Sequence, residues 1–222
     1  MILPRIYALL IGYGFGNFIT AYAVSYWRTG KSPRELGSGN PGTANIGAVL
    51  GKKFGILVLC GDLLKTLVAI LIAVWLFPDL GRLAIMYAGI GVTLGHNFPV
   101  WLKFQGGKGV AVSALLLVSY DLKWGLICLL IALAVLLITK DLALPGITIL
   151  LSFTVVNAVL YGLEPAIGFG FLTVLSIIRF WHDLVNLAHG KSKKIDLLQR
   201  FKKKPEVVSE NATNATKKDS QK

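Results

Sequence analysis

The stretch GHNFPVWLKFQGGKGVA, residues 95–111, lies between two apolar runs and leads from a polar loop into the next apolar segment. Its residues that suit an anion site share this loop: His96, Asn97, Gly106, Gly107, Lys108 and Gly109. Glycines let backbone N–H groups converge on an anion, and a lysine adds a mobile positive charge. A helix that begins near Lys108 would point its first free N–H groups at the same anion. The loop therefore predicts an anion site, with a flexible turn carrying a cytoplasmic lysine as the alternative.

The composition indicates a membrane protein. Of the 222 residues, 55% are hydrophobic and 15% charged, the mean hydropathy is +0.67, and the apolar residues come in long blocks. A net charge of +12 then suits anionic lipid headgroups better than nucleic acid. Cys60 and Cys128 lie inside apolar runs and are interpreted as small buried hydrophobes, not as a disulfide or metal site. The first apolar run is interpreted as a retained helix and not a signal peptide.

Seven apolar segments predict an all-α polytopic fold with seven transmembrane helices. They cover about residues 5–27, 54–77, 83–94, 109–120, 124–139, 142–160 and 165–181. The third to fifth are short for a bilayer that needs about 20 residues. Either flanking loop residues extend them or one is re-entrant, so five or six spans remain the alternatives. The glycines of the first segment, Gly12, Gly14 and Gly16, suit close helix packing.

Positive charge sorts the connections into two sets. One set is basic: Arg28, Lys31, Arg34, Lys52, Lys53, Lys103, Lys108, Lys140 and the lysines that follow the seventh segment, from Lys191 to Lys204. The other holds only Arg5, Arg82 and Lys123. The positive-inside rule then predicts an N-terminus outside and a C-terminus in the cytoplasm. We expect an integral membrane domain over residues 1–200 and a basic, disordered cytoplasmic tail over residues 201–222.

A second glycine-rich segment, GSGNPGTAN at residues 37–45, follows Arg34 on the same predicted face. Its hydroxyl and amide side chains would add hydrogen-bond donors to an anion site: Ser38, Asn40, Thr43 and Asn45. Two such loops on one membrane face predict a phosphorylated substrate, or two of them. A turn-rich connector is the alternative.

Asp62 and Lys65 lie three residues apart within the second apolar segment, on one helix face. Charges at membrane depth are costly and are usually paired or functional. Either the two neutralise each other, or Asp62 orients a basic residue of the site. A transporter or lipid scramblase with an Asp62–Lys65 relay is a different class of function, and it would need a cavity towards the far side of the membrane. The sequence contains no serine nucleophile elbow, HEXXH metal motif or Walker lysine motif.

With these motifs in order, the chain resembles the bacterial integral-membrane acyl-phosphate:glycerol-3-phosphate acyltransferases. Three motifs carry the resemblance: residues 37–45, residues 95–111, and a weaker third from Arg179 through Asn186 and Gly190 to Lys194. The resemblance implies a seven-helix enzyme of the bacterial cell membrane with its active site facing the cytoplasm. It also implies acyl transfer from acyl phosphate to the 1-hydroxyl of glycerol 3-phosphate, giving lysophosphatidic acid for phospholipid synthesis, without acyl-CoA, metal or other cofactor.

The resemblance assigns roles by position. Lys108, His96 and Ser38 become the candidate catalytic residues. The candidate substrate-binding residues are Arg34, Gly39, Asn40, Gly42, Thr43, Asn45, Asn97, Gly106, Gly107, Gly109 and Arg179. The sequence departs from the family pattern at five positions. Ala48 stands where an arginine is usual, and Ala143 and Gly146 stand where serines are usual. Phe180 and Asp183 replace the usual histidine and asparagine. A relative that has lost catalysis or changed its acceptor is therefore an alternative, with Arg34 or Arg179 as the expected substitute for the missing arginine.

Acyl phosphate is an activated anhydride, so the expected chemistry needs charge neutralisation and positioning more than a strong acid. Two acceptors can take the hydroxyl proton, His96 or an oxygen of a substrate phosphate. The acyl chain is expected to enter between helices from the bilayer.

Overall fold

The structure, a computed structural model, describes residues 2–192. The expected tail (residues 201–222), the lysines from Lys193 onward and the end of the third motif at Lys194 lie outside these residues. The described part is all-helical. Its helices are α1 (Leu3–Gly16), α2 (Thr20–Thr29), α3 (Thr43–Val49), α4 (Lys52–Leu76), α5 (Arg82–Asn97), α6 (Val110–Tyr120), α7 (Leu122–Thr139), α8 (Ala143–Leu160) and α9 (Leu163–Ala188), with short 3-10 turns at Pro33–Glu35, Pro78–Leu80 and Val100–Leu102.

Six helical segments of the described chain are long and apolar enough to cross a membrane. They are Leu3–Thr29, Lys52–Leu76, Arg82–Leu102, Leu122–Thr139, Ala143–Leu160 and Leu163–Ala188. The third includes the turn after α5 and so reaches 21 residues. This agrees with the alternative in which flanking loop residues extend the short apolar segments. α6 remains short at 11 residues, or roughly 16 Å at the usual rise, against a hydrocarbon core of about 30 Å. The multi-pass helical fold is confirmed.

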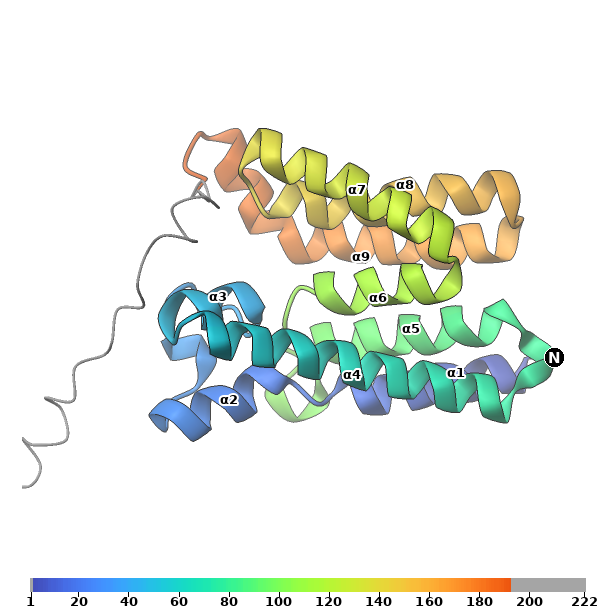
Figure 1. Ribbon diagram of the computed structural model, residues 1–222, viewed down its shortest axis with the longest axis horizontal. Helices are drawn as coiled ribbons and strands as arrows, with labels where there is room; N and C mark the ends of the chain where they lie inside the picture. Colours follow the sequence, from blue (N-terminus) through green and yellow to red (C-terminus); the bar gives the residue numbers. More distant parts are fainter. Residues whose placement is uncertain (1, 193–222) are drawn as a thin grey trace, which may run out of the picture.

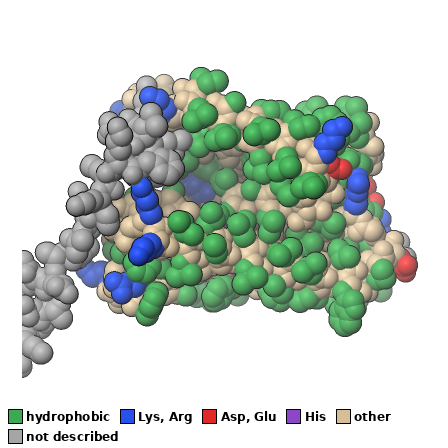
Figure 2. All heavy atoms as spheres, in the orientation of Figure 1, with side chains coloured by type: hydrophobic (Ala, Val, Ile, Leu, Met, Phe, Trp, Pro, Cys, Tyr) green, Lys and Arg blue, Asp and Glu red, His purple; other side chains and the backbone are tan. Residues whose placement is uncertain are grey.

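The helices form two groups with α6 between them (Figure 1). α1, α4 and α5 lie together on one side, α7, α8 and α9 on the other, and α2 and α3 gather at the end of the bundle away from the N-terminus (Figure 1). Hydrophobic side chains cover the long sides, and lysines and arginines cluster at the two ends (Figure 2). We call the end with α2, α3 and the loop after α5 the loop end, and the opposite one the far end.

Glycines bring α1 and α5 into close contact. A Cβ on Gly12 would lie 2.0 Å from the Ala88 carbonyl oxygen, and a Cβ on Gly95 would lie 2.4 Å from that of Tyr13. No side chain fits in these positions, so the two backbones approach as small residues allow between membrane helices. The predicted packing role is confirmed for Gly12 and Gly16, whereas Gly14 faces open space.

The first predicted span is not one helix, because the chain breaks between Gly16 and Thr20. Asn17 ties this break to the loop after α5. Its side-chain oxygen accepts a hydrogen bond from the Val100 backbone N–H, and its carbonyl accepts one from the Trp101 indole N–H, both at 2.8 Å. The break thus fixes the start of the loop that carries Lys108. The buried prediction for the cysteines holds for Cys128 and is wrong for Cys60, which is exposed on α4.

The far end is closed by paired charges. Arg5 donates to both carboxylate oxygens of Glu164 at 2.6 and 2.9 Å, and the Tyr87 hydroxyl donates to the same carboxylate at 2.8 Å. Asp121 accepts a hydrogen bond from Tyr161 at 2.6 Å and pairs with an arginine of α5 at 3.5 Å. These contacts join α1, α5 and α9, and they join the start of α7 to the end of α8, so they hold the bundle together at this end.

Candidate active site

The glycine-rich loop folds back onto the end of α5. The N–H groups of Gly106 and Gly107 donate to the carbonyls of Asn97 and His96, both at 2.9 Å. A Cβ on Gly106 would lie 2.0 Å from the His96 carbonyl oxygen, so only glycine permits this approach. Both N–H groups are therefore occupied, and the expectation that these two converge on an anion is wrong. The glycines serve instead to seat the loop against α5.

Two arginines hold the same loop by its carbonyl groups. Arg179 on α9 donates to the carbonyls of Gly107 and Gly106, at 3.1 and 2.9 Å. Arg34 donates to the carbonyl of Gln105 and, at 3.0 Å, to the Tyr22 hydroxyl. A guanidinium has five N–H donors, so each arginine retains donors for a further acceptor. Arg34 precedes the first motif and contacts the second, and Arg179 links the second and third.

Lys108 points to α9. Its ammonium donates to the Asp183 carboxylate at 2.5 Å and lies 4.8 Å from the centre of the Phe180 ring. The lysine side chain remains 26% exposed, so the pair is at the rim of the site. The cation predicted from the sequence is present, and it is paired with a carboxylate.

The start of α6 supplies further donors close to Lys108, where the sequence predicted a helix to begin. The helix begins at Val110 after Gly109, whose φ of 77° places it in the left-handed region that favours glycine. The first N–H groups of a helix have no partner within it. The N–H groups that follow Lys108 in the chain are therefore the ones able to meet an anion.

The first glycine-rich segment is organised by Asn45. Its amide nitrogen donates to the carbonyls of Pro33 and Leu36, at 3.2 and 2.9 Å, and its oxygen accepts from the Ser38 N–H at 2.8 Å. Asn45 is 4% exposed, so its side chain holds the loop in shape. This geometry gives it a positioning role.

The remaining predicted residues of the two loops differ in their surroundings. Ser38 is exposed, and Gly39, Asn40 and Gly42 are half-buried beside it. Thr43 Oγ1 and Asn97 Oδ1 are buried without a hydrogen-bond partner in the described structure. Unpaired buried oxygens are costly, so both mark places where the site can still accept a donor.

His96 belongs to a buried network that the sequence indicated only in part. Lys65 and Asp62 form an ion pair at 3.0 Å, as one alternative predicted. The Lys65 ammonium also lies 3.0 Å from His96 Nδ1, and Asp62 Oδ1 lies 3.8 Å from the same nitrogen. The other alternative, that Asp62 orients a basic residue of the site, has His96 as its candidate. The link to His96 depends on the packing of α4 against α5, which sequence spacing did not reveal.

The departures from the family pattern fit one another sterically. A Cβ on Gly146 would lie 2.7 Å from the Phe180 ring, so a serine at position 146 would collide with the phenylalanine. Phe180 is 2% exposed, and Ala143 is buried nearby in α8. Ala48 is exposed on α3. The Phe180 ring thus needs glycine at position 146, so these two departures from the family pattern depend on each other, and both lie beneath Lys108.

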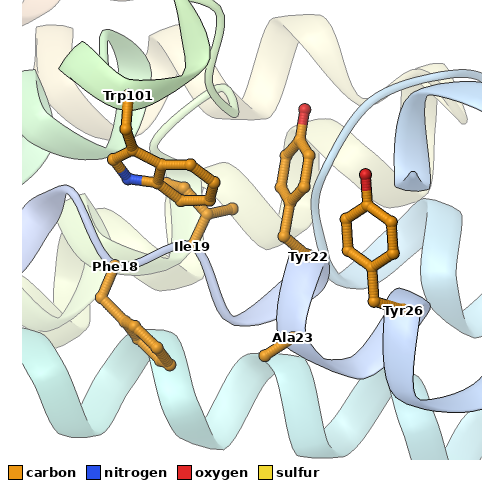
Figure 3. A pocket seen from close by; sticks show the side chains of 6 residues that line it. All are labelled: Phe18, Ile19, Tyr22, Ala23, Tyr26 and Trp101. Atoms are coloured by element: carbon orange, nitrogen blue, oxygen red, sulfur yellow. The ribbon is translucent and has the colours of Figure 1, made fainter. Parts of the chain in front are cut away.

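Two apolar hollows adjoin the loop end. One, of about 250 Å³, is lined by Phe18, Ile19, Tyr22, Ala23, Tyr26 and Trp101, and Figure 3 shows their side chains around it. The other is an open groove of about 800 Å³ between α1 and α4, lined mainly by apolar side chains and including Gly14 and Lys65. Within residues 2–192 no group of three His, Cys, Asp or Glu side chains is arranged to hold a metal ion.

Comparisons with known proteins agree with this geometry. The family described as "Glycerol-3-phosphate acyltransferase" matches residues 6–190. Glycerol-3-phosphate acyltransferase 1 of Lactobacillus acidophilus is 47% identical over 208 residues, which cover 94% of this chain and 100% of the relative.

Two solved structures are also similar, both of PlsY (YgiH), an integral membrane glycerol 3-phosphate acyltransferase. The glycerol 3-phosphate form has a TM-score of 0.78 at 28% identity and covers 88% of this chain and 97% of its own. The lysophosphatidic acid form has a TM-score of 0.78 at 26% identity and covers 90% and 99%. The chain belongs to the glycerol-3-phosphate acyltransferase family.

Proposed function

We propose that this protein transfers a fatty acyl group from acyl phosphate to the 1-hydroxyl of glycerol 3-phosphate, giving lysophosphatidic acid. The observation that carries the proposal is the meeting of Arg34, Lys108 and Arg179 on one glycine-rich loop. Three cations beside a helix start suit substrates that each carry a phosphate. The acyl transfer to glycerol 3-phosphate itself is inferred from membership of the family.

In the proposed step the 1-hydroxyl oxygen attacks the acyl carbon, and the new ester bond forms as the bond to the phosphate oxygen breaks. The bonding electrons and the negative charge leave with inorganic phosphate, and the hydroxyl proton passes to a phosphate oxygen. The protein neutralises the two phosphates and aims the hydroxyl. No metal or cofactor takes part in this scheme.

Substrate phosphate would bind by exchange at Lys108. The Asp183 carboxylate holds the ammonium as a phosphate oxygen would, at 2.5 Å. On binding, we expect the phosphate to replace this carboxylate and to take remaining donors of Arg34 or Arg179. Ser38 and Asn40, at the open side of the first loop, are proposed to contact the glycerol phosphate, while Gly39, Gly42 and Asn45 shape that loop.

The acyl chain is proposed to lie in the open groove between α1 and α4. This groove is apolar, it opens on the side of the bundle, and Lys65 lines it. A long acyl chain needs a hydrophobic channel that ends near the charged site. Lateral entry from the bilayer follows from that position.

We also propose the finer topology expected from the sequence. The site residues gather at the loop end, and the N-terminus lies at the far end (Figure 1). With the basic connections in the cytoplasm, this gives an N-terminus outside, seven membrane segments including α6, and an active site facing the cytoplasm of a bacterial cell membrane. Residues 1–200 would form the membrane domain.

The proposal is tested with the purified full chain in lipid nanodiscs. Supplied with acyl phosphate and glycerol 3-phosphate, it should release phosphate and form lysophosphatidic acid in equal amounts. Omitting glycerol 3-phosphate should stop both. Absence of product with folded protein, together with activity gained by Ala48→Arg, would instead identify a relative that has lost catalysis.

Topology is tested separately by labelling Ser38→Cys and Gln105→Cys in sealed vesicles, in a background in which Cys60 is replaced by alanine. Both positions should react from the cytoplasmic side. Labelling of either one from the outer side alone would overturn the orientation.

A further inference from the structure

The Lys65 ammonium sits at the point where α1 breaks, surrounded by acceptors. Its Nζ lies 2.6 Å from the Phe18 carbonyl oxygen, 3.3 Å from that of Gly16 and 3.0 Å from Asp62 Oδ1. The fourth neighbour is His96 Nδ1, at 3.0 Å. Lys65 is 6% exposed, so water does not replace these partners.

The number of protons determines how His96 must bond. An ammonium has three protons and no lone pair, so it cannot accept a hydrogen bond from the imidazole. As the cation of an ion pair with Asp62, Lys65 directs its three protons to the three nearest acceptors, which are the Phe18 carbonyl oxygen, Asp62 Oδ1 and His96 Nδ1, while the Gly16 carbonyl oxygen at 3.3 Å is the most distant neighbour. His96 Nδ1 must therefore accept from Lys65, because a proton on that nitrogen would face the ammonium at 3.0 Å.

The second nitrogen of His96, Nε2, faces the glycine-rich loop that carries Lys108. A Cβ on Gly107 would lie 2.3 Å from Nε2, so this nitrogen is directly beneath the glycine that precedes Lys108. No described residue forms a hydrogen bond with Nε2, and it is not among the fully enclosed polar atoms without a partner. A proton on Nε2 would therefore point to the glycine-rich loop at Gly107.

We propose that Lys65, held by Asp62, is a positioning residue that fixes His96 in the Nε2–H tautomer, so that His96 acts as a hydrogen-bond donor to the substrate and not as a base. This inference rests on the proposed function for the identity of the substrate. It assigns the hydroxyl proton to a phosphate oxygen. An N–H fixed in advance stabilises charge that develops on the acyl oxygen in the transition state.

A spectroscopic test addresses the tautomer directly. The full chain is labelled with ¹⁵N-histidine in lipid bilayers, and His96 is assigned by comparison with His96→Gln among the three histidines of the sequence. We expect a pyrrole-type shift for Nε2 and a pyridine-type shift for Nδ1. In Lys65→Met the nearby Asp62 carboxylate can accept from Nδ1, so the two shifts should exchange or average. A wild-type signal with the proton on Nδ1 would overturn the inference, even if the protein were inactive as an acyltransferase.

Kinetics then separates positioning from a purely structural role. Lys65→Met should lower kcat by about 100-fold, with a smaller change in KM for glycerol 3-phosphate. The matched control is Thr66→Val, the next buried residue of α4, whose hydroxyl bonds only to its own helix at the Asp62 carbonyl. It should leave both kcat and the histidine shifts unchanged. Loss of thermal stability in Lys65→Met with unchanged histidine shifts, or retained kcat with exchanged shifts, would overturn the positioning role. If Lys65→Met does not fold, the wild-type spectrum alone still tests the tautomer.

Discussion

The two ends of the bundle use arginine in different ways. At the far end the Arg5 guanidinium meets both oxygens of Glu164, at 2.6 and 2.9 Å. At the loop end Arg34 and Arg179 donate to backbone carbonyls and a tyrosine hydroxyl, and neither forms an ion pair with a carboxylate of the described chain. The charge of Arg5 is thus neutralised within the protein, whereas the charges of Arg34 and Arg179 have no carboxylate partner in the described chain, which suits the phosphate binding proposed above.

Lys108 lies between these two cases. It has a carboxylate partner, but that pair is partly exposed and joins a loop to a helix rather than helix to helix. Partly exposed ion pairs contribute little to stability, so such a pair can be exchanged for a phosphate at low cost. The comparison predicts that loop-end substitutions change turnover and that far-end substitutions change stability.

The largest effect is expected for Lys108→Ala. Loss of a charged contact to phosphate should reduce kcat/KM by about 100-fold or more, with the melting temperature nearly unchanged. The matched control is Lys123→Ala, whose ammonium lies over the Trp124 ring 5.4 Å from its centre at the far end. Wild-type turnover in Lys108→Ala would show that this lysine does not contribute to the active site.

Arg179→Lys should have the next largest effect. Lysine keeps the charge but loses the planar group that spans the carbonyls of Gly106 and Gly107, so kcat/KM should fall by roughly 10-fold or more. Arg5→Lys is the counterpart at the far end. It should lower the melting temperature and leave turnover close to wild type. Reduced turnover in Arg5→Lys, with a lower melting temperature but normal turnover in Arg179→Lys, would contradict the different roles of the two ends.

Asp183→Asn tests whether the carboxylate competes with phosphate. Freed of its partner, Lys108 should bind inorganic phosphate more tightly, with a gain of about fivefold or less. The measurement is product inhibition by phosphate in the acyltransferase assay, with Asp79→Asn in the connection between α4 and α5 as the control. Weaker inhibition in Asp183→Asn would show that the carboxylate assists phosphate binding.

The smallest effect concerns the far end and pH. Hydrogen bonds from the Trp124 N–H and the Tyr161 hydroxyl hold the pKa of Asp121 below its usual value. A lowered pKa in the folded state gives stability that is fully present above about pH 4 and is lost as pH falls through the folded pKa. The difference in melting temperature between wild type and Asp121→Asn should therefore shrink below about pH 4. A difference that grows in acid would refute this assignment.

Much of the fold follows from sequence pattern because long apolar runs must become helices in a bilayer. Helix ends were predicted within a few residues where a glycine or charged residue ends the run, as at Tyr120 and Thr139. The break after Gly16 was missed. It is stabilised by hydrogen bonds from Lys65 and from the Val100 backbone N–H, which come from distant parts of the chain.

The site was less predictable than the fold. Sequence spacing brought attention to Lys108 and Arg34, the family resemblance added Arg179, and the structure brings the three to one loop. It could not show that the glycine N–H groups bind α5 carbonyls, because a GGKG pattern is compatible with either use. Nor could it show that Phe180 fills the space that Gly146 leaves, since that contact joins α8 and α9.

Phosphate binding by Lys108 and the two loop-end arginines is tested most directly by an experimental structure of the full chain in lipid with glycerol 3-phosphate bound. We predict a phosphate within about 3 Å of Lys108 Nζ and of a guanidinium nitrogen of Arg34 or Arg179. We also predict that Asp183 no longer pairs with the lysine. A phosphate bound away from all three cations, with the Lys108–Asp183 pair intact, would contradict phosphate binding by these residues.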